Sequence, residues 1–153
     1  MTDPAAPTSV LDLAGCPYVL LTTYDREGRA RPTPVWAARD GEALVVTTTA
    51  QAWKVGRVER RPRITLARCD MRGRPRGAPV DGVAVVVRGP LARRVEAAMV
   101  AKYGWQMRLA ALVGSLSRTP VERVGIVIRD VAHGEDRAQE RGAASGADEG
   151  PYR

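Results

Sequence analysis

The hydrophobic residues of the chain recur mostly with the two-residue period of β-strands. Residues 18–24 form one β-branched and aromatic run, and Ile64 and Leu66 alternate with smaller residues in a later segment. Turn-forming residues at 25–28 and 39–41 separate the first three runs. The pattern predicts six strands, at about residues 18–24, 29–37, 42–48, 63–69, 80–88 and 121–131. We expect the first three to form a meander of consecutive antiparallel strands.

Three segments carry the period of α-helices instead. A short helix is predicted over residues 51–60, because the position before Pro62 disfavours the helical conformation. Two further helices are predicted, over residues 91–103 and 109–116. Six short strands with helical inserts, and no alternation of strand and helix, predict a mainly β, α+β fold: a small closed or split antiparallel β-barrel.

Length and composition suit one domain with a real core. The chain has 153 residues, and 44% of them are hydrophobic. A chain of this length would be crowded as two domains. We expect an N-terminal arm with a short helix over residues 1–16 and the barrel over residues 17–132. Residues 133–153 are rich in Gly, Ala and acids and predict a disordered tail.

The chain is basic, with a net charge of +7 and 24 basic residues, of which only Lys54 and Lys102 are lysines. This balance favours an anionic partner: a nucleic acid, an anionic lipid or a polyanionic small molecule. The preference for arginine is also typical of a high-GC genome, so part of the excess reflects codon usage. No apolar stretch approaches a membrane span, and Cys16 and Cys69 suit reduced core thiols. We therefore expect a soluble, cytoplasmic protein without a membrane partner.

Residues 47–57 carry the most informative chemistry. Thr47 and Thr48 end a β-branched strand that runs into a helix start, where Lys54 and Arg57 share one helix face. A helix start supplies unpaired N–H groups and a partial positive charge. Hydroxyls, amides and two cations at one place suit a phosphate, so we interpret the segment as the phosphate clamp of a flavin-type cofactor. Trp53 lies off the apolar stripe, which favours a surface or ligand role over a core role.

The predicted second strand contains two prolines that alter its edge. The strand includes Arg31, Pro32, Thr33, Pro34, Val35 and Trp36. Pro32 and Pro34 are two residues apart, so both missing N–H groups fall on the same side. That side is either an exposed edge or is covered by something that needs no donors, such as a flat heterocycle. Trp36 fits a core role as well as a ligand role.

Other parts of the sequence narrow the chemistry. The loop with Arg72, Arg74 and Arg76 could be a solvated turn, a nucleic-acid contact or the rim of an anion site. His133 is the single histidine and lies in the expected tail, which excludes a Ser-His-Asp or Cys-His arrangement on the core. The sequence has no metal-ligand spacing, no Gly-rich dinucleotide motif and no P-loop motif. If the protein is an enzyme, a cofactor carries the chemistry.

Taken together, these motifs resemble a known family. The run Tyr18–Thr23, the Thr33–Trp36 strand, the Lys54-x-x-Arg57 helix that ends at Arg61-Pro62-Arg63, and the later Lys102–Trp105 segment resemble the pyridoxamine-phosphate-oxidase-like split β-barrels. The similarity is strongest to the branch described as F420-dependent oxidoreductases, and it spans about residues 17–131. It implies an FMN-binding-protein-like split barrel that forms a homodimer with two cofactor sites at the interface.

The resemblance also implies roles for individual residues. The strand from Arg31 to Trp36 would line the cofactor ring through its backbone. Thr47, Thr48, Lys54 and Arg57 would hold the phosphate, and Trp53 would flank it. Gly77 would lie near the ring, and Trp105 would come from, or face, the second subunit.

The leading hypothesis from the sequence is a homodimeric oxidoreductase that uses F420 to transfer hydride to a small unsaturated substrate. A basic groove from Lys54 and Arg57 toward Arg72 and Arg74 would take the phospholactyl and glutamate tail. Trp53 stands where FMN-dependent oxidases often place an arginine, so FMN is the second candidate cofactor. A cofactor carrier without turnover is a third reading. Few aromatic residues and no recognised motif count against a nucleic-acid partner.

Overall fold

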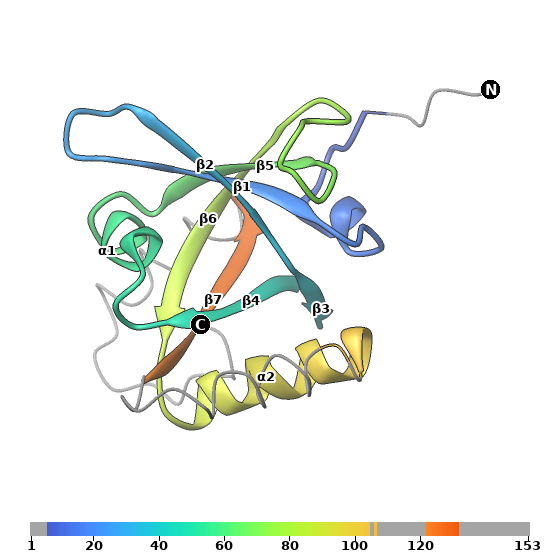
Figure 1. Ribbon diagram of the computed structural model, residues 1–153, viewed down its shortest axis with the longest axis vertical. Helices are drawn as coiled ribbons and strands as arrows, with labels where there is room; N and C mark the ends of the chain where they lie inside the picture. The colour runs from blue at the N-terminus through green and yellow to red at the C-terminus, as the bar shows by residue number, and fades with distance from the viewer. Residues whose placement is uncertain (1–5, 105, 107–121, 132–153) are drawn as a thin grey trace.

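Within the described residues, seven antiparallel strands form one sheet in the spatial order β2-β1-β5-β6-β7-β4-β3 (Figure 1). The computed structural model describes residues 6–104, 106 and 122–131, so the predicted helix at 109–116, Trp105 and the predicted tail lie outside the described residues. The strands are β1 (Val19–Tyr24), β2 (Ala30–Val35), β3 (Ala38–Asp40), β4 (Ala43–Thr49), β5 (Arg63–Arg68), β6 (Val80–Val87) and β7 (Arg123–Asp130). The helices are the 3-10 turn η1 (Val10–Leu13), α1 (Trp53–Arg60) and α2 (Pro90–Tyr103).

The prediction of six strands is wrong, because the segment predicted as one strand over residues 29–37 makes two. β2 pairs with β1, with Val35 opposite Val19. β3 pairs instead with β4, with Ala38 opposite Val45. The predicted meander is therefore wrong as well, since β4 lies between β3 and β7 and does not pair with β2. The other five predicted strands are confirmed, with ends that differ by at most two residues.

The two halves of the divided strand are the opposite edges of the sheet. β2 is the first strand in the spatial order and β3 is the last. The two residues between them, Trp36 and Ala37, therefore join the edges through the chain itself, and we call them the corner. The corner bends the sheet into a split barrel: the edges meet there and have no ladder between them elsewhere.

Apolar side chains fill the barrel, and η1 and α1 lie at its two ends (Figure 1). Val10 and Leu13 of η1 and Val58 of α1 belong to the same buried cluster as the inward-facing strand residues. The Ser9 hydroxyl donates to the Asp130 carboxylate at 2.7 Å, and the Val10 N–H donates to the same carboxylate at 2.8 Å. These bonds fix η1 to the end of β7.

Helix α2 covers the outer face of β3, β4 and β7 (Figure 1). Val95 and Met99 pack in a second buried cluster with Val45 and Val127. Gly125 on β7 permits the close approach, because a Cβ there would lie 2.7 Å from Cγ2 of Val95. None of the helices in the described part of the chain is both long and apolar enough to cross a membrane.

The end of α2 holds the corner. The Ala37 N–H donates to the Tyr103 hydroxyl at 3.0 Å, and that hydroxyl lies 3.0 Å from the carbonyl oxygens of Ala37 and Pro17. Ala37 is fully buried. The Ala37 N–H and carbonyl are not part of a strand ladder at the bend, so side chains must supply their hydrogen-bond partners.

The neighbouring lysine completes this arrangement. The Lys102 ammonium donates to the Cys16 carbonyl at 2.8 Å and also to the Ala37 carbonyl. The Trp36 ring stacks on the Tyr103 ring with centroids 4.9 Å apart and planes 13° apart. One pair of residues on α2 therefore ties the corner to the segment that leads into β1.

We predict that Tyr103→Phe lowers the free energy of unfolding by about 1–3 kcal/mol, because the buried Ala37 N–H loses its acceptor. Urea denaturation followed by circular dichroism measures the change. The matched control is Tyr24→Phe, since the Tyr24 hydroxyl makes no hydrogen bond within the described residues; its effect should stay within about 0.5 kcal/mol. Equal effects of the two variants would contradict the role given to Tyr103.

A second prediction concerns the contact between α2 and β7. Gly125→Ala should lower the free energy of unfolding by about 1–3 kcal/mol, because the new methyl group overpacks against Val95. Gly15→Ala is the control, as nothing lies within 4 Å of a Cβ at that position. The same denaturation experiment applies, and a neutral Gly125→Ala would show that α2 sits farther from the sheet.

Candidate functional site

Two strand edges next to the corner have no partner strand within the described residues. β2 pairs only with β1. A regular ladder with β1 requires Pro32 and Pro34 to sit where no donor is needed, so their missing N–H groups face the open edge. β4 pairs with β3 only over Ala43–Val45, so its edge over residues 46–49 has no strand beside it among the described residues. We call these two edges the seam.

The strand register decides which side chains of β2 face the barrel interior. Arg31 is opposite Thr23 and Thr33 is opposite Leu21, and directly opposed residues share a face of the sheet. Thr23 and Leu21 are buried, so Arg31 and Thr33 lie on the inner face, in line with the buried Val35. Pro32 and Pro34 lie on the outer face.

Arg31 is fixed at the rim of this inner face. Its guanidinium lies 3.2 Å from the Asp25 carboxylate in the β1–β2 turn, and Arg29 pairs with the same carboxylate at 3.0 Å. Desolvation raises the pKa of Asp25, but hydrogen bonds from the Arg29 N–H and from both guanidinium groups outweigh it and lower that pKa to about 2. Asp25 therefore stays ionised and holds Arg31 in place at any ordinary pH.

The two threonines at the end of β4 point to opposite faces. Leu44 and Val46 are in the barrel interior, so Thr48 follows them inward and is buried, whereas Thr47 faces outward. The Thr47 hydroxyl accepts from Arg123 at 3.4 Å. The structure therefore does not bring Thr47 and Thr48 together, and only Thr48 shares a face with Arg31 and Thr33.

Helix α1 begins two residues later than predicted, at Trp53. Its N-cap is Ala52, whose side chain cannot accept a hydrogen bond, and its first turn contains no acid. The first N–H groups of α1 therefore lack a side-chain cap. Val55 and Val58 are buried, while Trp53 is 80% exposed, which confirms that the indole lies off the apolar stripe.

Lys54 and Arg57 form a cationic pair on α1 that pairs with no acid of the described residues. Neither side chain has an ion pair within the described residues. Lys54 is half-buried, and desolvation together with the neighbouring Arg57 charge lowers its pKa. A partly desolvated charge without a counter-ion is unfavourable, so an anion bound here would relieve it.

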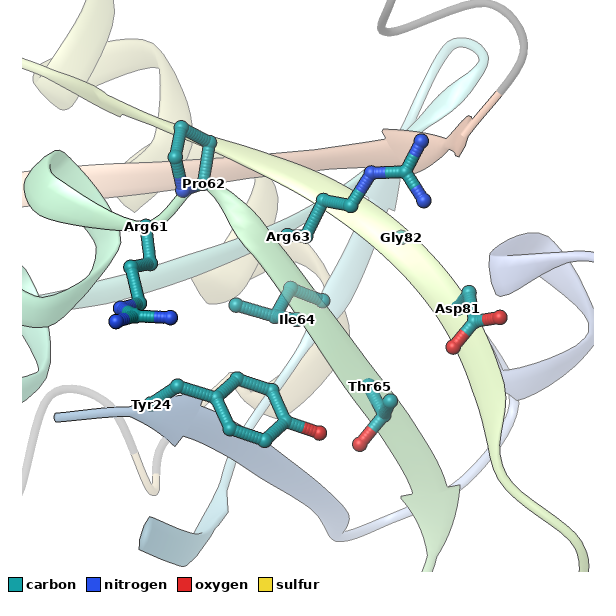
Figure 2. A pocket seen from close by; sticks show the side chains of 8 residues that line it. All are labelled: Tyr24, Arg61, Pro62, Arg63, Ile64, Thr65, Asp81 and Gly82. Atoms are coloured by element: carbon teal, nitrogen blue, oxygen red, sulfur yellow. The ribbon is translucent and has the colours of Figure 1, made fainter. Parts of the chain in front are cut away.

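A pocket of about 440 Å³ opens beyond the other end of α1 (Figure 2). It lies where the ends of β1, β5 and β6 meet. The residues that line it are Tyr24, Arg61, Pro62, Arg63, Ile64, Thr65, Asp81 and Gly82. In Figure 2 the Tyr24 and Thr65 hydroxyls point toward each other, Arg61 lies on the Tyr24 side, and Asp81 lies at the far end. Sequence analysis missed this pocket, and its only sequence signal was the Arg61-Pro62-Arg63 segment.

Three other predicted residues have different surroundings. The Trp36 ring is stacked on Tyr103 and so serves the corner. Gly77 is exposed in the loop between β5 and β6. Trp105 lies outside the described residues.

The arginine-rich loop is ordered around one carboxylate. Asp70 accepts from the N–H groups of Arg72 and Arg74 at 2.9 Å each and from the Arg76 guanidinium at 3.0 Å. The backbone hydrogen bond from Arg74 is the largest of several causes that lower the pKa of Asp70. A Cβ on Gly73 would lie 3.4 Å from the Pro34 ring, so the loop covers the outer face of β2.

Both cysteines line a second cavity of about 470 Å³, together with Asp12 and Arg68. They are free thiols. Burial raises the pKa of Cys69, and the neighbouring Asp70 acts in the same direction. Cys69 is therefore protonated at neutral pH and is a poor nucleophile.

A comparison with known families matches residues 10–129 to the family described as pyridoxamine 5'-phosphate oxidase. The chain belongs to the pyridoxamine 5'-phosphate oxidase family. This confirms the resemblance at the level of the family and agrees with the antiparallel split-barrel fold. Comparison with curated proteins gives no match.

Several solved structures share the fold of this family member. A protein titled F420 reductase is 25% identical, with 81% of this chain and 94% of that chain covered and a TM-score of 0.54. A heme storage protein from Vibrio cholerae is 18% identical, with 76% and 82% covered and a TM-score of 0.56. A conserved hypothetical protein from Mycobacterium tuberculosis is 19% identical, with 98% and 97% covered and a TM-score of 0.57.

The two lysines of this oxidase-family chain provide a matched test of the cationic pair. Lys54→Met should raise the free energy of unfolding at pH 7, because it removes a half-buried charge without a counter-ion. Lys102→Met should lower it by about 1–3 kcal/mol, because the part-buried Cys16 and Ala37 carbonyls lose the ammonium donor. Urea denaturation measures both.

The pH dependence checks the same assignment. The pKa of Lys54 is lowered in the folded protein, so the folded state releases this proton before the unfolded state does. The free energy of unfolding should therefore rise with pH between the lowered pKa of the folded state and 10.5, the ordinary pKa of a lysine. Part of this rise should disappear in Lys54→Met. If Lys54→Met is instead as destabilising as Lys102→Met, Lys54 has a structural partner and the interpretation fails.

Proposed function

We propose that the protein is a homodimeric oxidoreductase that uses the deazaflavin F420 as its hydride carrier. The observation that carries the proposal is the cationic pair of Lys54 and Arg57, which follows directly on the β4 edge of the seam and has no acidic partner within the described residues. Half-buried cations beside uncapped N–H groups favour a phosphate. The similarity to a protein titled F420 reductase supports the choice of cofactor.

Each part of the seam would serve a different part of the cofactor. The β2 edge at Pro32 and Pro34 presents backbone without N–H donors, which suits contact with a planar ring. Lys54, Arg57 and the first N–H groups of α1 would hold the phosphate. Of the two threonines, we assign Thr48 to this site, because its side chain lies on the inner face.

The resemblance supports further assignments that stay predictions. Trp53, next to Lys54 and exposed to solvent, would flank the phosphate. Gly77 would approach the ring from the loop between β5 and β6, and Trp105 would come from or face the second subunit. The homodimer is also a prediction from the resemblance, and light scattering of the purified protein would test it.

The protein's own part in the reaction would be binding and orientation. F420, when bound, supplies a hydride for an electron-poor double bond of a small substrate. Arg31 pairs with Asp25 at the rim, and the corner joins the two edges of the seam. A rigid site that holds both reactants in position can account for much of the reduction in the barrier.

We predict that the purified protein binds F420 with micromolar affinity and that Lys54→Ala weakens binding by about 1.5–3 kcal/mol, the scale of a hydrogen bond to a charged group. Fluorescence titration measures both. The control is Arg93→Ala, which removes an exposed cation on α2 and should leave the affinity unchanged. Unchanged affinity in Lys54→Ala would show that the clamp is misassigned.

Parallel titrations separate the alternatives on the same fold. An FMN-dependent oxidase or reductase would purify with a flavin spectrum and bind FMN more tightly than F420. A cofactor carrier would bind F420 tightly but reduce nothing in a panel of enones and quinones. Absence of F420 binding at tens of micromolar would overturn the proposal.

A further inference from the structure

The two cysteines of the chain are far apart in sequence but border the same cavity. Cys16 lies between η1 and β1, and Cys69 directly follows β5. β1 and β5 are antiparallel neighbours, and their ladder ends with Val19 opposite Arg68. Both cysteines therefore lie just beyond the same end of that ladder, where they line the cavity of about 470 Å³.

The two thiols also act on each other electrostatically. Desolvation is the main cause that raises the pKa of the Cys69 thiol, Asp70 is the next, and the neighbouring Cys16 acts in the same direction. Interactions between charges weaken with distance and are screened by solvent, so this influence agrees with the shared cavity in placing the two side chains close together. They are free thiols in this structure. Formation of a disulfide would draw their Cα atoms to about 4.4–6.8 Å from each other.

The segment that carries Cys16 is the one that can adjust. Cys69 is held by the end of β5 and by a β-bridge to Pro75. Cys16 belongs to a connecting segment instead, and nothing lies within 4 Å of a Cβ placed on the preceding Gly15. A small movement of this segment toward the end of β5 therefore meets little resistance from packed neighbours.

The two thiols differ in their access to solvent. Cys16 is half-buried, whereas Cys69 is only 9% exposed. A small oxidant that enters the cavity therefore meets Cys16 first. The protonated Cys69 thiol reacts slowly with a dissolved reagent, but a group held beside the reacting atom gains the large advantage of an intramolecular reaction.

We propose that Cys16 and Cys69 are a thiol pair that hydrogen peroxide converts into a disulfide. Peroxide oxidises the Cys16 thiol to a sulfenic acid and is itself reduced to water. The Cys69 sulfur then attacks the Cys16 sulfur, and the S–S bond forms as the Cys16 hydroxyl group leaves with the Cys69 proton as a second water. A small dithiol reverses the reaction by thiol–disulfide exchange. The inference does not depend on the proposed cofactor.

The disulfide would act on the part of the fold that holds the corner. The Cys16 carbonyl accepts from the Lys102 ammonium at 2.8 Å, and the same ammonium donates to the Ala37 carbonyl. A bond from Cys16 to Cys69 would therefore connect the corner and the end of α2 to the end of β5. Because the cross-link closes a long loop, over residues 16–69, it should restrict the unfolded chain strongly.

The test treats the native wild-type protein with peroxide at about one equivalent per chain. Intact mass spectrometry should show a product lighter by two hydrogen atoms, and the two free thiols should disappear together. Peptide mapping without reduction should find the Cys16 peptide joined to the Cys69 peptide. The melting temperature should rise by about 5–10 °C, and dithiothreitol should restore the starting value.

Single variants separate the two steps. In Cys69→Ala the sulfenic acid at Cys16 has no partner, so dimedone should trap it on the Cys16 peptide. In Cys16→Ser the buried Cys69 should stay reduced under the same conditions. Circular dichroism checks that both variants are folded, and the result on the wild-type protein stands without them.

Three results would overturn the proposal. The first is a wild-type product that gains oxygen at Cys16 but forms no bond to Cys69. The second is a disulfide between two molecules in place of one within the chain. The third is an equal rate of cross-linking in native and urea-unfolded protein, because the fold would then play no part in bringing the thiols together.

Discussion

The fold depends on satisfying two buried backbone groups at one bend. At Ala37 the chain leaves the ladder with β1 and enters the ladder with β4, and the residue is fully buried there. Water cannot reach its N–H and carbonyl, so Tyr103 and Lys102 of α2 must supply the partners. Because the same two side chains also bind the Pro17 and Cys16 carbonyls, the bend, the start of β1 and the end of α2 are one unit.

The geometry of the candidate site follows from that bend. Two strand edges part at a shared corner and have no ladder between them within the described residues, and one of them carries prolines that cannot donate to a ladder. The helix that follows β4 then places Lys54 and Arg57 beyond the open end. No acid of the described residues neutralises this cationic pair, and such an unfavourable arrangement is typical of sites prepared for a ligand.

Much of the fold could be predicted from the sequence, because the two-residue period of strands such as β5 and β6 is a local signal. The corner could not be predicted, because residues 29–37 have the pattern of a single strand. Only the pairing of β2 with β1 and of β3 with β4 shows that the segment is divided. The prolines correctly indicated an unpaired edge at Pro32 and Pro34. The expectation that Thr47 and Thr48 act together ignored the alternation of side chains along β4. The pocket was missed because Tyr24, Arg61 and Asp81 come from distant segments that only the sheet order brings together.

The exposed indole of Trp53 has a practical consequence. It stands beside Lys54 and is 80% exposed, whereas Trp36 is stacked in a fixed environment against Tyr103. The two rings therefore emit from different surroundings, the first polar and the second shielded. A molecule that contacts the start of α1 would change the surroundings of the Trp53 indole and hence its emission, so this side chain is an optical reporter for that position.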